Sequence, residues 1–219
     1  GRIREVAVHT PYYLNLASAD EVVRNNSIRI IREDLERASM IGAEYCMTHL
    51  GSGRELGKEK AIGVVSDGLQ EILDGYKGSC EFLIEIAAGA GEVMGASFEQ
   101  ISEIIDRSGT GALGVCFDTQ HAFASGYDLR NTQAVQNTFD LFDSTIGLKR
   151  LKMSHCNDSV VELGARRDRH EHLGKGQIGL AGFRALLQEP RLAHINWYLE
   201  TESAGVKEDL EILKSIRAG

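Results

Sequence analysis

Short apolar runs that favour β-strands alternate along this chain with longer segments of helical periodicity. Apolar residues recur at helical spacing in the longer segments, for example at Ile28, Ile31 and Leu35. Strands are expected at residues 4–9, 44–49, 82–86, 113–118, 151–155 and 195–200, and further helices around 62–73, 101–105, 135–142 and 210–216. This alternation is typical of βα units around a parallel sheet and predicts a barrel-like α/β fold.

Length and composition fit a single domain that covers residues 1–219. Of the 219 residues, 42% are hydrophobic and 26% are charged, which is ordinary for a globular protein. No apolar run approaches the ~18 residues of a membrane span, and no linker divides the chain. The chain carries no visible targeting segment, so we expect a cytoplasmic protein that does not bind a membrane.

A residue that can bind a metal closes every predicted strand. The six are separated by 40, 36, 33, 37 and 45 residues, and they are His9, His49, Glu85, Asp118, His155 and Glu200. The carboxyl ends of parallel strands meet on one face, where barrel enzymes build their active sites. Three more candidates follow these ends, namely His121, Asp168 and His170. Imidazole mixed with carboxylate suits zinc or a similar divalent ion, so the sequence predicts a metal centre.

The net charge of −8 argues against a nucleic-acid partner unless acidic residues bind metal ions. Three divalent ions would add six positive charges and leave about −2, so a metal centre removes this objection. His172 and His194 lie outside the pattern of strand ends and receive no ligand role.

The four cysteines are expected to be reduced and partly buried. Each lies in or beside an apolar run and none forms a C-x-x-C pair; they are Cys46, Cys80, Cys116 and Cys156. Cys116 and Cys156 lie near predicted ligands, but their surroundings favour packed strand residues over nucleophiles.

Three stretches resemble signatures of the endonuclease IV family of apurinic/apyrimidinic endonucleases, which are zinc-dependent DNA repair enzymes. They are GVCFDTQHAFASGYD at 114–128, HCNDSVVELGARRDRHEHLGKGQIG at 155–179 and LETES at 199–203. The resemblance extends from about residue 6 to residue 203. It implies a TIM (β/α)8-type barrel that hydrolyses the phosphodiester 5′ to an abasic site in double-stranded DNA. The products would be a 3′-hydroxyl and a 5′-deoxyribose phosphate.

The resemblance also implies a trinuclear zinc centre, with Mn²⁺ possible at some positions. His9 and His49 would hold the first ion, and Glu85 would bridge it to the second. The second ion would be completed by Asp118, His155 and Glu200, and the third would be held by His121, Asp168 and His170. Glu85 would also be the catalytic proton acceptor.

Contacts to DNA are expected from Tyr12 and from a basic cluster made of Arg166, Arg167 and Arg169. Tyr12 lies three residues after the first ligand and would line the DNA side of the site. Two simpler interpretations stay open: Tyr12 as an aromatic residue packed on its loop, and the arginines as a solvated surface. By the resemblance, the protein is bacterial or archaeal, acts at the nucleoid, and at full length is a monomer without an obligate protein partner.

The chain departs from the family pattern beside two predicted ligands. Residues 86–90 after Glu85 read IAAGA where the family has polar residues, and Leu50 follows His49 where a proline is common. Lys175 stands where an acidic residue is common. These differences leave the ligand set intact and bear on the DNA contacts and the substrate preference.

At about 38 residues per βα unit, the chain supplies six units, whereas a closed barrel needs eight. We therefore expect an amino-terminally truncated piece that lacks two units and a loop that penetrates DNA. Such a piece would have two exposed parallel edges and would cut DNA poorly by itself.

Two other functions fit parts of the pattern. A xylose isomerase-like sugar isomerase or epimerase also uses strand-end Glu, Asp and His residues, around one or two divalent ions. Such an enzyme has no use for His121, Asp168 and His170, so three bound metals per chain would favour the nuclease. A barrel that binds abasic DNA or structural zinc without cleavage is the third possibility.

Overall fold

The computed structural model describes residues 5–218, which form two compact units. Unit 1 contains residues 5–85 and 91–115, and unit 2 contains residues 86–90 and 116–218. Strand β4 (Leu113–Asp118) begins in unit 1 and ends in unit 2. The strand order is β1-β2-β3-β4 in unit 1 and continues as β4-β5-β8 in unit 2.

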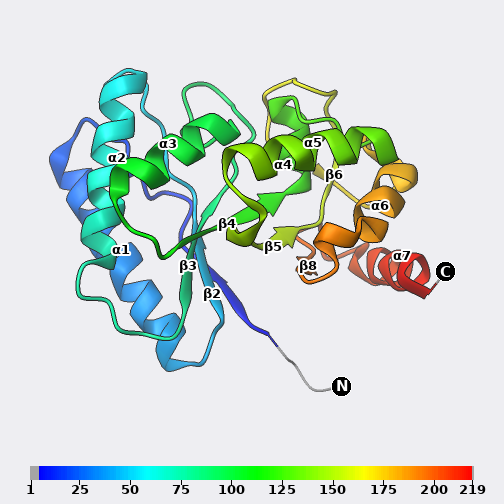
Figure 1. The fold of residues 1–219 in the computed structure, drawn as a ribbon, viewed down its shortest axis with the longest axis horizontal. Helices are drawn as coiled ribbons and strands as arrows, with labels where there is room; N and C mark the ends of the chain where they lie inside the picture. The colour runs from blue at the N-terminus through cyan, green and yellow to red at the C-terminus, as the bar shows by residue number, and fades with distance from the viewer. Residues whose placement is uncertain (1–4, 219) are drawn as a thin grey trace. The chain divides into compact units, whose positions relative to one another are not determined.

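Unit 1 is a parallel sheet with three helices. Its strands are β1 (Ala7–His9), β2 (Tyr45–Thr48) and β3 (Glu81–Glu85). The parallel register pairs His9 with Met47 and Thr48 with Ile84, which brings the carboxyl ends of the three strands to one edge. The helices are α1 (Glu21–Met40), α2 (Lys58–Leu73) and α3 (Phe98–Ser108), and α2 packs between the other two (Figure 1).

Local sequence signals define the helices of unit 1. The Asp20 side chain accepts a hydrogen bond from Val22 N at 2.8 Å and so caps α1. The buried stripe of α1 follows the predicted spacing and contains Ser27, Ile28, Ile31, Leu35 and Ala38. Helix α3 begins after a Ser97 cap and ends at Gly109, whose φ of 64° is easily reached only by glycine.

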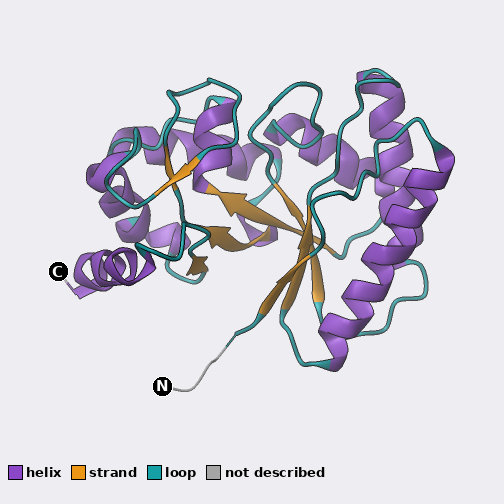
Figure 2. Ribbon diagram, turned by 180° about the vertical axis from the view of Figure 1, so that it is seen from behind, coloured by secondary structure: helices purple, strands orange, loops and turns teal. Residues whose placement is uncertain are grey.

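Unit 2 has a parallel part and a small antiparallel part. Its other elements are α4 (Thr119–Ser125), α5 (Thr132–Thr145), the 3-10 turn η1 (Leu148–Arg150), β5 (Leu151–His155), β6 (Asp158–Ser159), β7 (His170–Glu171), α6 (Gly179–Gln188), η2 (Pro190–Leu192), β8 (Asn196–Tyr198) and α7 (Val206–Ala218). Strand β5 pairs parallel with β8, and helix α6 packs against both α5 and α7. The antiparallel pair β6–β7 stands apart from the main sheet among loops (Figure 2).

The predicted alternation of strands and helices is confirmed. Strands β4 and β5 have the predicted bounds, but β2 ends one residue before His49 and β8 ends two residues before Glu200. Those two predicted ligands therefore lie in loops. Residue 4 of the first predicted strand lies outside the described residues, and α4, α6 and the β6–β7 pair were not predicted. The assignment of residues 1–219 to a single domain stays a prediction.

A buried carboxylate organises the glycine-rich loop of unit 2. Asp158 is fully buried and accepts hydrogen bonds from five backbone N–H groups, which belong to Ser159, Gly174, Gly176, Ile178 and Gly179. A Cβ on Gly176 would overlap the Ser159 carbonyl oxygen, so only glycine lets the loop close over this carboxylate.

The expectation of buried, reduced cysteines is confirmed: all four are free and buried. Burial raises the pKa of the Cys46 thiol to about 12 and that of the Cys80 thiol to about 11.

We expect none of the four cysteines to react with Ellman's reagent at pH 8 in the native protein, and all four to react after denaturation. Unfolding restores pKa values near 9.0, so the free energy of unfolding falls as pH rises from about 9 toward 11. A thiol of the native protein that reacts as fast as free cysteine would contradict the predicted protection of all four cysteines.

Among the described residues, no helix combines the length and the apolar character that crossing a membrane requires.

Candidate metal sites

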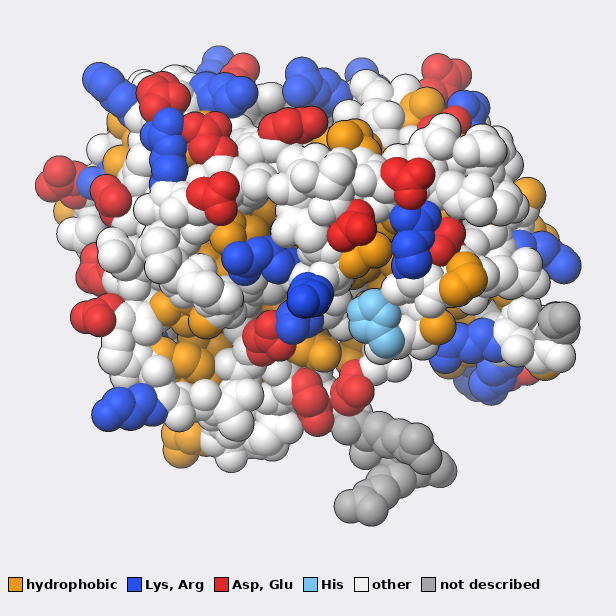
Figure 3. Space-filling view, in the orientation of Figure 1, with side chains coloured by type: hydrophobic (Ala, Val, Ile, Leu, Met, Phe, Trp, Pro, Cys, Tyr) orange, Lys and Arg blue, Asp and Glu red, His pale blue; other side chains and the backbone are white. Residues whose placement is uncertain are grey.

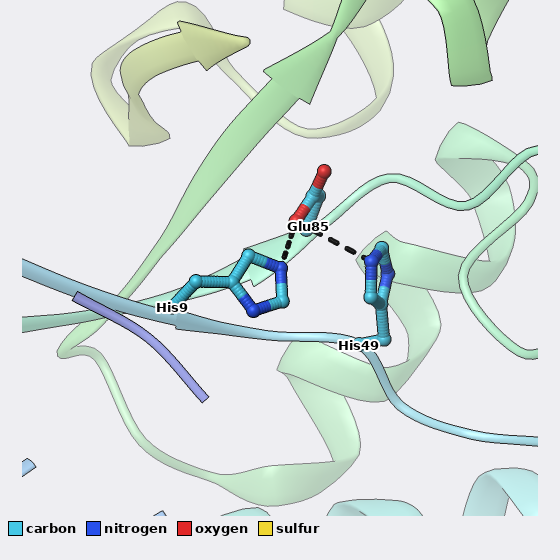
Figure 4. Close-up of side chains that lie close together, drawn as sticks. All are labelled: His9, His49 and Glu85. Carbon is cyan, nitrogen blue, oxygen red and sulfur yellow. Dashed lines mark hydrogen bonds and ion pairs between the residues drawn. The ribbon is translucent and has the colours of Figure 1, made fainter. Parts of the chain in front are cut away.

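Three predicted ligands meet at the strand ends of unit 1 (Figure 4). The Glu85 Oε2 atom lies 2.9 Å from His9 Nε2 and 3.6 Å from His49 Nε2. One ligand atom from each of the three residues lies within 4.8 Å of the others. His9 Nδ1 lies 2.6 Å from the Thr10 carbonyl oxygen, to which it can only donate, so in the neutral ring Nε2 carries the lone pair. This is the arrangement that a metal-binding imidazole needs. The cluster is named the unit 1 ligand cluster.

Tyr12 lies directly over these ligands. Its ring stacks on His9 at 4.9 Å between ring centroids and on His49 at 5.7 Å, with an interplanar angle of 28° in both cases. The side chain is 71% exposed, so it is not the packed loop residue of the simpler interpretation. It presents an aromatic face to solvent beside the ligands, and its contact with DNA stays a prediction.

The six other predicted ligands lie in unit 2, and three of them converge where β7 approaches α4. His121 Nε2 lies 3.4 Å from Asp168 Oδ2 and 3.4 Å from His170 Nε2, and His170 Nε2 lies 3.4 Å from Asp168 Oδ1. His121 Nδ1 lies 2.9 Å from the carbonyl oxygen of Ile86, so in the neutral ring the lone pair is on Nε2. Two imidazole nitrogens and a carboxylate thus face one another. The backbone at His170 is fixed by the β6–β7 pairing.

Asp118 caps a helix and also lies close to three other predicted ligands. Its Oδ1 accepts a 2.7 Å hydrogen bond from His121 N and caps α4. Its Oδ2 lies 3.9 Å from His155 Nδ1 and 3.8 Å from His170 Nε2. His155 Nδ1 is in turn 3.0 Å from Glu200 Oε2. Helix α4 begins directly after β4, so this one junction positions both Asp118 and His121. The six residues are named the unit 2 ligand cluster.

Asn157 supports this cluster and was missed from sequence. Its Nδ2 donates to Asp118 Oδ2 at 2.7 Å, and its Oδ1 accepts from Glu200 N at 2.9 Å. Two further hydrogen bonds join its backbone to the Thr119 hydroxyl. Asn157 is fully buried and orients one carboxylate while anchoring the loop that carries another. The available sequence signal for Asn157 was its position two residues after His155, inside the signature-like stretch at 155–179.

The donor chemistry of both clusters fits zinc. Asp118 and Glu85 are almost completely buried, and a buried carboxylate is stable only when cations or hydrogen-bond donors surround it. In each cluster the ligand atoms are imidazole nitrogens and carboxylate oxygens, as in zinc sites. The Cys156 thiol beside His155 is unsuited as a nucleophile, because burial raises its pKa far above the ordinary range.

The predicted basic cluster lies on an exposed loop of unit 2. Arg166, Arg167 and Arg169 are all exposed, and Arg166 has a φ of 55°, an uncommon value outside glycine. Arg169 donates to the Asp168 carbonyl oxygen at 2.6 Å. A pocket of about 480 Å³ lies beside it and is lined by residues that include Asp168, Arg169, His170, Glu200 and Thr201. On the face seen in Figure 3, acidic and basic side chains are interspersed.

The apolar departure after Glu85 has a structural explanation. Ile86 and Ala87 are buried, and their carbonyl oxygens accept hydrogen bonds from His121 Nδ1 and from Ser125 Oγ at 2.6 Å. The backbone of this segment thus orients the predicted ligand His121, while its side chains pack in the interior. Leu50 is likewise fully buried, whereas Lys175 is exposed.

Comparison with known proteins places this arrangement in a family. A family model described as a xylose isomerase-like TIM barrel matches residues 3–216. The probable endonuclease 4 of Natranaerobius thermophilus is 39% identical over 219 residues, which span 98% of this chain and 77% of that protein. The chain belongs to the endonuclease IV family. The crystal structure of endonuclease IV from Thermus thermophilus is 35% identical, with a TM-score of 0.83 over 98% of this chain and 75% of that one.

Membership in the endonuclease IV family confirms the predicted TIM-barrel type of α/β fold. The fold extends beyond nucleases: a D-tagatose 3-epimerase-like protein gives a TM-score of 0.72 at 24% identity, which is a likeness of fold alone. Distinguishing a nuclease from an isomerase therefore depends on the ligands. Both endonuclease relatives named above are bacterial proteins.

Proposed function

We propose that this chain is a zinc-dependent apurinic/apyrimidinic endonuclease that hydrolyses the phosphodiester 5′ to an abasic site in double-stranded DNA. The observation that carries the proposal is the cluster of His121, Asp168 and His170 in an endonuclease IV homologue. The products are a 3′-hydroxyl and a 5′-deoxyribose phosphate.

In this proposal, the unit 1 ligand cluster binds one zinc ion and the unit 2 ligand cluster binds two. His9, His49 and Glu85 would hold the first zinc ion. In unit 2, Asp118, His155 and Glu200 would hold the second, and His121, Asp168 and His170 would hold the third. Bound zinc would lower the pKa of water and neutralise the charge of the target phosphate. The bridging role of Glu85 stays a prediction, as does Mn²⁺ at some positions.

The side chains of the protein supply orientation and proton transfer. Glu85 is proposed to accept a proton from the attacking water, since its buried carboxylate lies 2.9 Å from His9 Nε2 among the proposed ligands of the first zinc ion. The side chain of Asn157 holds the Asp118 carboxylate and the Glu200 backbone in position through two hydrogen bonds. Tyr12 offers its exposed ring to the DNA beside the ligands, and Arg166 and Arg169 offer charge to backbone phosphates.

The alternative is a sugar isomerase or epimerase with the same fold. Such an enzyme needs one or two metal ions, so His121, Asp168 and His170 would have no metal ion to bind. Metal content separates the two functions, because near three zinc ions per chain favours the nuclease and one or two favours the isomerase.

A nicking assay tests the proposal. The substrate is a duplex with one tetrahydrofuran abasic analogue, and the matched control is the same duplex with an intact nucleotide. Because the chain spans about three quarters of the length of its relatives, the assay uses this chain and a version extended to their length. We expect the zinc-loaded extended form to nick only the lesion strand, 5′ to the analogue.

A metal-loaded extended form that leaves the abasic duplex intact would overturn the nuclease. Tight binding to the lesion without a nick would indicate a binding protein, and turnover of a ketose would indicate the isomerase.

A further inference from the structure

Asp209, in the first turn of α7, is a buried carboxylate with no role in the proposed ligand set. It is 1% exposed, and it accepts three hydrogen bonds. Its Oδ2 lies 2.7 Å from His172 Nδ1 and 2.7 Å from Thr201 Oγ1, and its Oδ1 lies 3.0 Å from Leu173 N. The carboxylate therefore joins two loop segments that are about thirty residues apart in the sequence.

Each of the two segments carries proposed metal ligands. His172 follows the ligand His170 by two residues, and Thr201 directly follows the ligand Glu200. The His170 Nδ1 atom also lies 3.4 Å from the Glu200 carbonyl oxygen, so the two segments run close together at the ligands. Both segments line the pocket of about 480 Å³ in unit 2. The hydrogen bonds of Asp209 fix their separation.

The surroundings of Asp209 hold this arrangement rigidly. Removing a carboxylate from water is costly. The buried Asp209 side chain therefore strongly favours the geometry in which all three hydrogen-bond donors are in place. The N-terminus of α7 favours negative charge at this position. The His172 ring is further confined by Gly205, where a Cβ would overlap the ring atoms. The His172 ring is thus held between Asp209 and the Gly205 backbone.

We propose that Asp209 is a positioning residue for metal binding: it holds the His170 and Glu200 segments at the separation that the unit 2 ligand cluster requires. The proposal rests on the proposed function, because it assumes that this cluster binds zinc. The zinc affinity of unit 2 would then depend on helix α7, which carries Asp209 and none of the proposed ligands.

The test measures zinc affinity and stability separately in this chain. Asp209→Asn keeps the side-chain shape but replaces one acceptor oxygen with a donor NH₂ group. Thr201→Val removes a single hydrogen bond at nearly constant volume. The matched control is Leu213→Ala, which removes buried apolar packing one turn further along the same helix. Zinc dissociation constants come from competition with a chromophoric chelator, and stability comes from the thermal midpoint of the apo protein.

We expect Asp209→Asn to raise the dissociation constants of the zinc ions proposed for unit 2 by ~10-fold, and Thr201→Val by a smaller factor, as for other residues that orient metal ligands. The zinc ion proposed for unit 1 should keep its affinity, so one measured dissociation constant should stay at its wild-type value. Leu213→Ala should lower the apo midpoint and leave zinc affinity unchanged.

Wild-type zinc affinity in both variants, together with a lowered apo midpoint, would overturn the proposal and leave Asp209 a structural residue. If Asp209→Asn does not fold, the Thr201→Val result decides. A wild-type chain that binds no zinc at unit 2 would refute the proposed function itself, which is a different outcome from unaltered affinity in the variants.

Discussion

Replacing Glu85 with Gln is expected to lower the rate of nicking at an abasic site by ~10³-fold, within the range found when a positioned acid or base is removed. Glu85 is 1% exposed, and its Oε2 is 2.9 Å from His9 Nε2. Gln keeps the shape but removes both the negative charge and the proton acceptor. The measurement is a single-turnover nicking rate with zinc-loaded protein of the length of its relatives.

Glu81→Gln is the matched control, because it makes the same chemical change at the other end of β3. It should leave the nicking rate within about twofold, since it lies away from the ligands. A Glu85→Gln variant that nicks at the wild-type rate while retaining its zinc would remove Glu85 from the chemistry. Zinc content measured on the same samples separates loss of the proton acceptor from loss of metal.

Removing zinc is expected to lower the thermal midpoint of the protein by on the order of 10 °C. A ligand at 1,000 times its dissociation constant stabilises the folded state by about 4 kcal/mol, and about 1 kcal/mol shifts the midpoint of a chain of this size by about 2–4 °C. Without metal, the buried carboxylates Glu85 and Asp118 each lose the cation proposed for their own cluster. The measurement is a thermal melt with and without a strong chelator.

Adding zinc back should restore the midpoint, and the upward shift should increase with the free zinc concentration. Magnesium is the matched control, because it prefers oxygen ligands whereas imidazole nitrogens dominate around His121 and His170. A midpoint indifferent to the chelator would contradict metal binding at both clusters.

Much of the fold was accessible from local patterns. The helical spacing of Ile28, Ile31 and Leu35 predicted the buried face of α1, and the apolar runs at 113–118 and 151–155 predicted β4 and β5 to the residue. Periodicity reports burial, so it is a strong signal where an element has one buried face. The β6–β7 pair was inaccessible, because two-residue strands have no period and depend on partners in a separate segment of the chain.

The candidate ligands at the strand ends were equally accessible, because the carboxyl ends of parallel strands converge on one face. Asp168 and His170 lie beyond the strand ends and received their ligand role from the family resemblance. The sequence by itself determined the alternating α/β architecture, the nine candidate ligand residues and the resemblance to endonuclease IV. Only the tertiary structure decided how the ligands are held. Asn157, Asp209 and the Ile86 carbonyl each make a hydrogen bond to a residue 35 to 39 positions away. Such contacts leave no period or spacing in the sequence, since they depend on how distant segments pack.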